Sequence, residues 1–286
     1  MANHSPAARA PQQKPVRVIA VTSGKGGVGK TNISVNLAAS FAKRGNNVLL
    51  MDADLGLANV DILFDLHPKF DLRHVIAGER SLDEIIVDAP LGLKVIPASS
   101  GVSSMADLSP AENAGLVRAF SELKFPVDTM IVDTAAGISD SVITFCKACQ
   151  EVVVVVCDEP TSITDAYALI KVMSRDHGVK RFHILANMVN SNAHGEELFR
   201  KISRVTDHFL DIVAVHIGSI PMDDYLRKAV RHQMPVVEAF PRSPSARAIN
   251  RLAKAIDQWP LPELASGNME FFIERVVGFP NEEYAA

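Results

Sequence analysis

The sequence predicts an α/β fold with a single doubly wound, mostly parallel sheet flanked by helices. Three observations support this class. Short apolar segments alternate with amphipathic helical segments from residue 16 to residue 259. A glycine-rich segment joins the first predicted strand to the first helix. Acidic residues follow two of the later apolar strands, where ligands bind in open parallel sheets.

The first predicted unit is strand, glycine loop and helix. Val16–Val21 is an apolar, β-branched run typical of a buried strand. Gly24–Thr31 matches the pattern G-x-x-x-x-G-K-[ST], which cradles phosphates in many nucleotide-binding proteins. Asn32–Arg44 then carries apolar residues on one helical face. This order of elements turns the pattern into a predicted phosphate-binding site.

Each position of the loop has a predicted role in binding. Glycines let backbone N–H groups approach phosphate oxygens, and the helix N-terminus adds partial positive charge. Lys30 is expected to reach the β- and γ-phosphates, and the Thr31 hydroxyl to hold Mg²⁺. The predicted nucleotide-binding residues of the loop are Gly24, Lys25, Gly26, Gly27, Val28, Gly29, Lys30 and Thr31.

Lys25 is not demanded by the general pattern. A lysine directly after the first glycine cannot easily fold back onto the phosphates of its own loop. From the sequence it is either a solvated charge or a group directed at another molecule.

The second group of candidates lies at the ends of predicted strands. Asp52 and Asp54 end the strand 47–52, and Asp133 ends the strand 128–133. An acid after an apolar strand, opposite a P-loop, holds Mg²⁺ through water. We therefore expect Asp52 and Asp133 on the metal side and Asp54 to orient the attacking water. The alternative for the first pair is one strand-end acid and one helix cap.

Gly137 follows Asp133 in the segment D-T-A-A-G. It could place a backbone N–H against a γ-phosphate, in a loop that orders with nucleoside triphosphate.

Recognition of the base is expected from the late strands. Asn187 ends the strand 182–187, and its amide can both donate to and accept from a purine edge. Pro221 and Asp223 lie in the loop after the last strand and could form the other wall. Asn187 as a plain strand terminator is the alternative.

The remaining elements complete the alternation. Further strands are expected at 93–98, 152–157 and 212–220, and helices at 82–87, 109–123, 163–176, 195–206, 223–232 and 245–258. The run Val152–Cys157 is apolar on both faces, as a central parallel strand should be.

The two ends of the chain depart from this pattern. Residues 1–15 are rich in Ala, Pro and Gln and are expected to form a disordered arm. Residues 16–259 form the predicted nucleotide-binding domain, and residues 260–268 a linker broken by prolines. Residues 269–279 are predicted to form a short amphipathic helix, since Met269, Phe272, Ile273 and Val276 share one helical face.

Composition and charge argue against several classes of protein. A net charge of −4 over 286 residues gives no global case for nucleic-acid binding. No apolar run is long enough for a bilayer span, and the N-terminus lacks an apolar signal core, so we expect a cytoplasmic protein. Three cysteines argue against a disulfide scaffold.

Several motifs together resemble a known family. K-G-G-V-G-K-T with the extra Lys25, D-A-D-L-G-L-A-N-V-D at 52–61, D-T-A-A-G at 133–137 and I-P-M-D at 220–223 resemble the MinD/ParA class of ATPases with a deviant Walker A motif. This similarity covers residues 16–259. The segments 157–171 and 270–277 resemble the flagellar number regulators of the FlhG (FleN) type.

The resemblance implies an ATPase that binds ATP and Mg²⁺, hydrolyses ATP slowly and dimerises when ATP is bound. It implies Lys25, Lys30 and Asp54 as catalytic residues, with Lys25 crossing to the partner's nucleotide, and Thr31, Asp52 and Asp133 on the metal side. Glu159 and the loop after it would lie at the dimer contact. Implied partners are the GTPase FlhF, a transcription activator of the FleQ type and, through residues 269–277, the inner-membrane surface. Direct nucleic-acid binding is not expected.

Two departures from the FlhG pattern affect these expectations. Residues 1–15 lack the D-Q-A-x-x-L-R segment that stimulates FlhF, so direct stimulation of that GTPase is doubtful. The late helix carries Glu270 and Glu274 against one arginine, whereas membrane-binding helices are usually more basic. Docking of this helix on its own domain is therefore the alternative to lipid binding.

Two other functions fit parts of the sequence. Cys146 and Cys149 form a C-x-x-C that could hold an iron–sulfur cluster shared across a dimer, although buried structural thiols are the alternative. A DNA- or cargo-partitioning ATPase of the ParA type would need a basic surface. The candidates are Arg200, Lys201 and Arg204, or Arg242, Arg247, Arg251 and Lys254.

Overall fold

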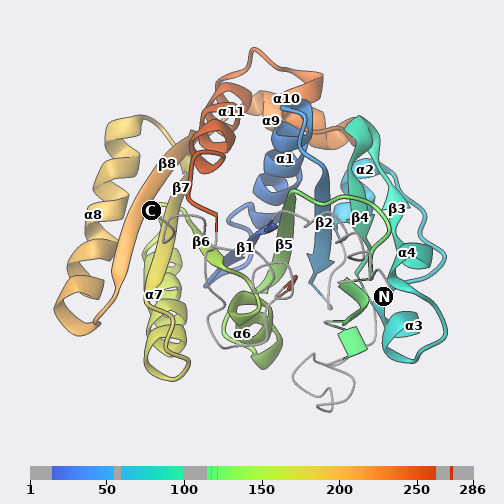
Figure 1. The fold of residues 1–286 in the computed structure, drawn as a ribbon. Helices are drawn as coiled ribbons and strands as arrows, with labels where there is room; N and C mark the ends of the chain where they lie inside the picture. The colour runs from blue at the N-terminus through green and yellow to red at the C-terminus, as the bar shows by residue number, and fades with distance from the viewer. Residues whose placement is uncertain are drawn as a thin grey trace, which may run out of the picture.

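A computed structural model of the chain describes residues 15–54, 59–98, 115–116, 118–120, 122–261 and 271–272. Within these ranges eight strands form one sheet in the order β3-β4-β2-β5-β1-β6-β7-β8 (Figure 1). The strands are β1 Arg17–Ser23, β2 Val48–Ala53, β3 Val87–Asp88, β4 Lys94–Ile96, β5 Thr129–Ala136, β6 Glu151–Val156, β7 Arg181–Val189 and β8 Val213–Pro221.

Every strand pair is parallel except β3 with β4. The predicted doubly wound, mostly parallel sheet is therefore confirmed. The short antiparallel edge was not predicted: the expected helix at 82–87 ends at Ile85, and Val87 begins β3. A two-residue strand leaves too little alternation for a sequence pattern to reveal it.

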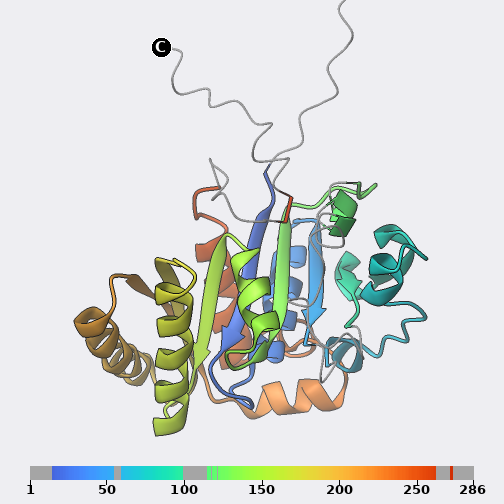
Figure 2. The ribbon, with the colours of Figure 1, turned by 90° about the horizontal axis from the view of Figure 1, so that it is seen from below.

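Helices cover both faces of the sheet. They are α1 Lys30–Lys43, α2 Val60–Phe64, α3 Leu72–Ile76, α4 Leu82–Ile85, α6 Asp140–Lys147, α7 Pro160–Arg175, α8 Asn192–Phe209, α9 Asp224–Arg231, α10 Val236–Ala239 and α11 Pro244–Ile256. Helices α1, α10 and α11 pack on one face and α6, α7 and α8 on the other (Figures 1 and 2).

Apolar side chains on both faces of the central strands explain these layers. All seven residues of β1 and five of the six residues of β6 are buried. Alternate residues of β1 belong to different core clusters: Val18 and Ala20 face α6 and α7, whereas Ile19 and Val21 face α1 and α11. A strand buried on both faces needs a helix layer on each side.

The sheet's strand order places the glycine loop near its middle. β1 lies between β5 and β6, and α1 follows β1 directly. Because these strands are parallel, the ends of β1, β2, β5 and β7 meet at one edge of the sheet. That edge carries the residues of the candidate site.

The last described residues return to the domain. Phe271 and Phe272 are buried, and their rings lie 4.6 and 5.6 Å from the ring of Phe120. The Phe271 N–H donates to the Ala148 carbonyl at 3.1 Å. These two residues form a turn, with Phe272 at φ 59°. The C-terminal segment is therefore anchored on its own domain at this point.

Several predicted segments lie wholly or mainly outside the described residues. They are the N-terminal arm 1–15, the linker 260–268, the first half of the helix 109–123 and most of the amphipathic helix 269–279. The domain boundaries therefore stay predictions. In the described part of the chain, no helix is both long and apolar enough to cross a membrane.

Candidate functional site

The glycine loop turns sharply between β1 and α1. Gly27 and Gly29 have φ values of 82° and 89°, in the left-handed region that glycine adopts without strain. Gly29 is the residue before the first turn of α1, and its carbonyl accepts the Ile33 N–H at 3.0 Å. The free N–H groups at this helix start are the kind that bind phosphate.

At two positions of the loop, neighbouring atoms leave no room for a side chain, so only glycine fits. A Cβ at Gly24 would lie 2.1 Å from the backbone of Asp165 in α7. A Cβ at Gly29 would lie 2.6 Å from the Asn187 amide nitrogen. Packing from two other elements thus holds the loop in its shape.

Lys30 is the second lysine of the loop and lies at the start of α1. It is 8% exposed, and burial lowers the pKa of its amine although the charges of Asp133 and Asp54 raise it. The amine therefore lies close to the two acids that the sequence assigned to the site.

Asp133 lies on β5 and is 1% exposed. The Ser34 hydroxyl donates to its Oδ1 at 2.8 Å, and Oδ2 has no hydrogen-bond partner. Burial raises the pKa of Asp133 to about 6, despite the nearby hydroxyls of Thr31 and Ser34 and the charge of Lys30. A buried carboxylate oxygen without a protein partner is a position where a water or a cation can bind.

Asp52 lies directly opposite Asp133 on the neighbouring strand β2. It is 3% exposed, and burial followed by repulsion from Asp133 raises its pKa to about 7. Its oxygens accept backbone N–H groups of Asp54, Asn59 and Val60 at 3.0, 3.1 and 3.2 Å. Asp52 is therefore also bonded to the start of α2. From the sequence, such a structural role was only the alternative for one of the two acids Asp52 and Asp54.

The residues present fit a bound Mg²⁺. This ion prefers oxygen ligands and usually keeps several waters. The Thr31 hydroxyl and the free Asp133 Oδ2 offer such oxygens beside the loop, and Asp52 lies opposite. Thr31, Asp133 and Asp52 would hold the ion and its waters, and the ion would neutralise phosphate charge.

Asp54 follows β2, and its charge acts on both Lys30 and Asp133. Asp54 therefore belongs to the same cluster as Lys30 and Asp133, and it follows Asp52 by two residues in the sequence. Its role in orienting water stays a prediction.

Gly137 has φ 100°, and its N–H donates to the Ser23 carbonyl at 2.9 Å. In this structure the N–H is therefore bonded to β1. The sequence had suggested instead that it faces a γ-phosphate.

Lys25 extends away from its own phosphate cradle. Its amine lies 2.6 Å from Glu159 Oε2 and 2.8 Å from the Thr161 hydroxyl. Glu159 is the residue directly before α7, and Thr161 lies in the first turn of that helix. The expectation that Lys25 does not fold back onto its own loop agrees with this position.

Asn187 supports the loop from β7. It is 2% exposed, and its amide nitrogen donates to the Val28 carbonyl at 2.8 Å. The strand continues to Val189, so Asn187 does not terminate it. The hydrogen bond describes a brace for the loop, and contact with a base stays a prediction.

Asp223 is committed to other contacts. Its carboxylate accepts from the Tyr225 N–H at the start of α9 and from the N–H and hydroxyl of Ser245 at the start of α11. Pro221 ends β8. The backbone of Pro221 and Asp223 can still form one wall of a base site. The Asp223 side chain, however, joins α9 to α11.

The local sequence patterns around Ser34, Glu159 and Thr161 did not predict that these residues belong to the site. Ser34 lies within α1, and a serine in a helix gives no signal of a partner 99 residues away. Thr161 and Glu159 contact Lys25 from more than 130 residues along the chain. Only the family resemblance had pointed to Glu159.

Comparison with known proteins identifies the family. The family model ParA, described as NUBPL iron-transfer P-loop NTPase, matches residues 14–257. The chain belongs to the ParA/MinD family of P-loop NTPases. The glycine loop, the buried acids and the parallel sheet agree with this membership.

Two relatives share most of their length with the chain. It is 55% identical over 266 residues to the antiactivator FleN of Pseudomonas aeruginosa, covering 93% of this chain and 95% of that one. It is 33% identical to the flagellum site-determining protein YlxH of Helicobacter pylori, covering 92% and 88%.

Solved structures show the same fold. A chain of the MinC:MinD cell division protein complex of Aquifex aeolicus superposes with a TM-score of 0.69 at 27% identity, covering 86% of this chain and 98% of that one. MinD of Pyrococcus horikoshii, solved with Mg-ADP, gives 0.67 at 21% identity, covering 85% and 96%. Structural neighbours of this chain thus include a P-loop protein with a bound magnesium nucleotide.

Proposed function

We propose that this ParA/MinD family member is an ATP-binding and ATP-hydrolysing dimerisation switch that regulates the number and placement of flagella. In this proposal it restrains a transcription activator of the FleQ type and acts together with the GTPase FlhF. The observation that carries it is the similarity to the antiactivator FleN over nearly the whole of both chains.

The ATP part of the proposal is supported by the cluster of Lys30, Thr31 and Asp133. A buried amine at a helix start, a hydroxyl and a free carboxylate oxygen suit a magnesium nucleotide. Asp54 would orient water for hydrolysis. The reaction is ATP plus water to ADP and phosphate, used as a timer for dissociation.

The dimer part is supported by Lys25. Its amine lies on Glu159 and Thr161, away from the cradle of its own chain. In the ATP-bound dimer it would leave these partners and place its charge on the nucleotide of the other subunit, as an arginine finger does in trans.

The proposal also includes a cellular location. We propose a cytoplasmic protein that meets the inner membrane peripherally through residues 269–277. The buried Phe271 and Phe272 support a state in which this segment is docked on the domain instead.

The iron–sulfur alternative has less support. Cys146 and Cys149 are 1% and 7% exposed, and burial raises the pKa of Cys146 to about 12. Cluster ligands are thiolates, and a cluster shared by two chains needs them at a surface. Absence of thiolate–iron absorption after anaerobic reconstitution would remove this alternative.

Light scattering tests the proposed switch. The full chain should be monomeric with ADP and dimeric with a non-hydrolysable ATP analogue, and Lys25→Ala should stay monomeric with both. Liposomes should be bound only with the analogue. A FleQ-type activator should co-elute with the analogue-bound dimer. A chain that stays monomeric with the analogue would contradict the switch.

A further inference from the structure

Strand β8 leaves one edge of the sheet open. It has nine residues and pairs only with β7 in the described sheet. Eight of its nine residues are partly or fully exposed, and Val213 is 58% exposed. A long edge strand presents N–H and C=O groups that can pair with another chain.

The opposite edge is better protected against pairing than β8. β3 has two residues, and short edge strands resist pairing. Strand β8 contains no lysine, arginine, aspartate or glutamate, and its single proline is the last residue. Its one titratable side chain is the half-buried His216. Burial lowers the pKa of His216, which keeps its ring neutral near pH 7. The register between β7 and β8 shifts at two places, between His216 and Gly218 and between Ser219 and Pro221.

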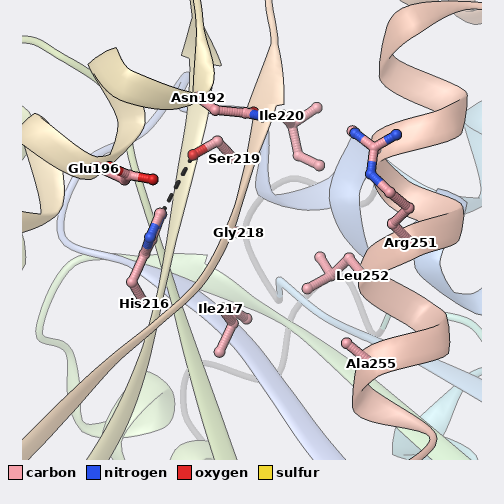
Figure 3. A pocket seen from close by; sticks show the side chains of 11 residues that line it. Asn192, Glu196, His216, Ile217, Gly218, Ser219, Ile220, Arg251, Leu252 and Ala255 are labelled. Atoms are coloured by element: carbon pink, nitrogen blue, oxygen red, sulfur yellow. Dashed lines mark hydrogen bonds between the residues drawn. The ribbon is translucent and has the colours of Figure 1, made fainter.

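A groove follows this edge. Five consecutive residues of β8, 216–220, form its floor, with a cavity of about 330 Å³. Figure 3 shows Asn192 and Glu196 of α8 on one side and Arg251, Leu252 and Ala255 of α11 on the other. Since α8 and α11 cover opposite faces of the sheet, a groove lined by both runs along the free edge.

The two walls of the groove differ in character. On the α8 side, the His216 ring stacks on Phe199 at 5.3 Å and bonds to Ser219, while Glu196 lies beside it (Figure 3). This side combines an aromatic stack with polar side chains, and Glu196 disfavours acidic groups.

The α11 side contributes one cation to the groove lining, Arg251, beside Ala248, Leu252 and Ala255. Arg247, Arg251 and Lys254 are exposed at a spacing that places them along one face, and α11 contains no acidic residue. Within the described parts of the chain none of the three makes an ion pair. In a protein with net charge −4, a row of unpaired cations beside an open strand is a local reversal of charge.

We propose that the groove along β8 binds an extended acidic segment of another protein, which joins the sheet as a further strand. The open backbone selects an extended chain, and α11 selects acidic side chains on the row that faces it. The row that faces α8 would be uncharged. This inference does not depend on the proposed nucleotide switch.

Peptide binding to the full chain tests the proposal. The probe is a fluorescein-labelled peptide of nine residues, the length of β8, in which glutamate and valine alternate. We expect saturable binding by anisotropy and slower amide exchange in residues 213–221. A peptide with lysine in place of glutamate should bind at least about tenfold more weakly, although the protein is acidic overall.

Two variants locate the site. Arg251→Glu should weaken binding of the glutamate peptide at least about tenfold and should improve binding of the lysine peptide. Arg204→Glu makes the same charge change on the exposed face of α8, outside the groove lining, and should leave both affinities within about twofold. Equal losses in the two variants would overturn the proposal.

Backbone methylation tests strand addition itself. Two versions of the glutamate peptide carry N-methyl groups on alternate residues, so that only one version blocks the N–H groups facing β8. One version should lose binding and the other should keep it. Equal binding of both, or no saturable binding of the unmodified peptide, would overturn the proposal.

A nucleic-acid ligand is the competing outcome for the basic row. A short mixed-sequence DNA duplex should not bind at physiological salt. Duplex binding that Arg251→Glu abolishes, with no binding of the glutamate peptide, would assign the row to phosphates and overturn the proposal.

Discussion

The Lys25 amine lies 2.6 Å from the Glu159 carboxylate of the same chain. The two residues are 134 positions apart, and the pair joins the glycine loop to the first turn of α7. The Glu159 hydrogen bond raises the pKa of Lys25, so the lysine stays charged while it is held away from its own cradle. A lysine in this position must leave Glu159 before it can serve another chain.

Glu159→Gln tests this contact. Because this ion pair is exposed and therefore weak, releasing Lys25 should lower the protein concentration for analogue-induced dimerisation by no more than about fivefold. Sedimentation velocity with a non-hydrolysable ATP analogue measures the change. Glu197→Gln, on the exposed face of α8, is the matched control. Weaker dimerisation of Glu159→Gln would mean that Glu159 serves the dimer instead.

Lys30→Ala should remove nucleotide binding. The buried amine is the cation nearest to the predicted phosphate positions, and its loss should weaken ATP affinity at least about 100-fold. Titration with a fluorescent ATP analogue measures this, and circular dichroism checks the fold. Lys171→Ala, an exposed lysine of α7, should bind as the unchanged protein does. Retained affinity in Lys30→Ala would contradict the nucleotide site.

Asp54→Ala should separate binding from hydrolysis. Removing a group that orients water should slow ATP hydrolysis by about 100-fold or more while nucleotide affinity is kept. The dimer should then persist with ATP itself in size-exclusion chromatography. Asp211→Ala, at the opposite end of the sheet, should hydrolyse ATP at the unchanged rate. Normal hydrolysis by Asp54→Ala would move the water-orienting role elsewhere.

Phe272→Ala should destabilise the domain. Its ring is fully buried and lies against Phe120, so truncation should lower the free energy of unfolding by about 3 kcal/mol. Urea denaturation measures the difference. Leu261→Ala, 42% exposed, should change it by less than about 0.5 kcal/mol. An unchanged midpoint for Phe272→Ala would mean that the segment contributes nothing to the folded core.

Asp158 should give stability a defined pH dependence. Hydrogen bonds from His194 and then Lys201 hold its pKa below the ordinary value of 3.8, and they join the connection between β6 and α7 to α8. Its contribution is therefore complete above about pH 4 and is lost as the pH falls through the lowered pKa. Asp158→Asn should be less stable than the unchanged protein at pH 7, and the difference should shrink below pH 4. Thermal melts across this range measure it. A constant difference would show that protonation of Asp158 is not the cause.

The sequence determined the local features of this protein. A glycine pattern between an apolar strand and a helix predicts a phosphate loop because each part depends on neighbours a few residues away. Runs such as the valines of β6 predict central strands for the same reason. The acids Asp52, Asp54 and Asp133 could be assigned to one edge because parallel strands end together.

The tertiary structure decided the contacts between distant segments. Asn187 braces Val28 and Asp223 joins α9 to α11, although the sequence had placed both near a base. Lys25 meets Glu159, and the open groove of β8 exists because α8 and α11 cover opposite faces of the edge strand. These relations depend on the order of strands across the sheet, which a local pattern does not contain, because its signals extend only a few residues along the chain.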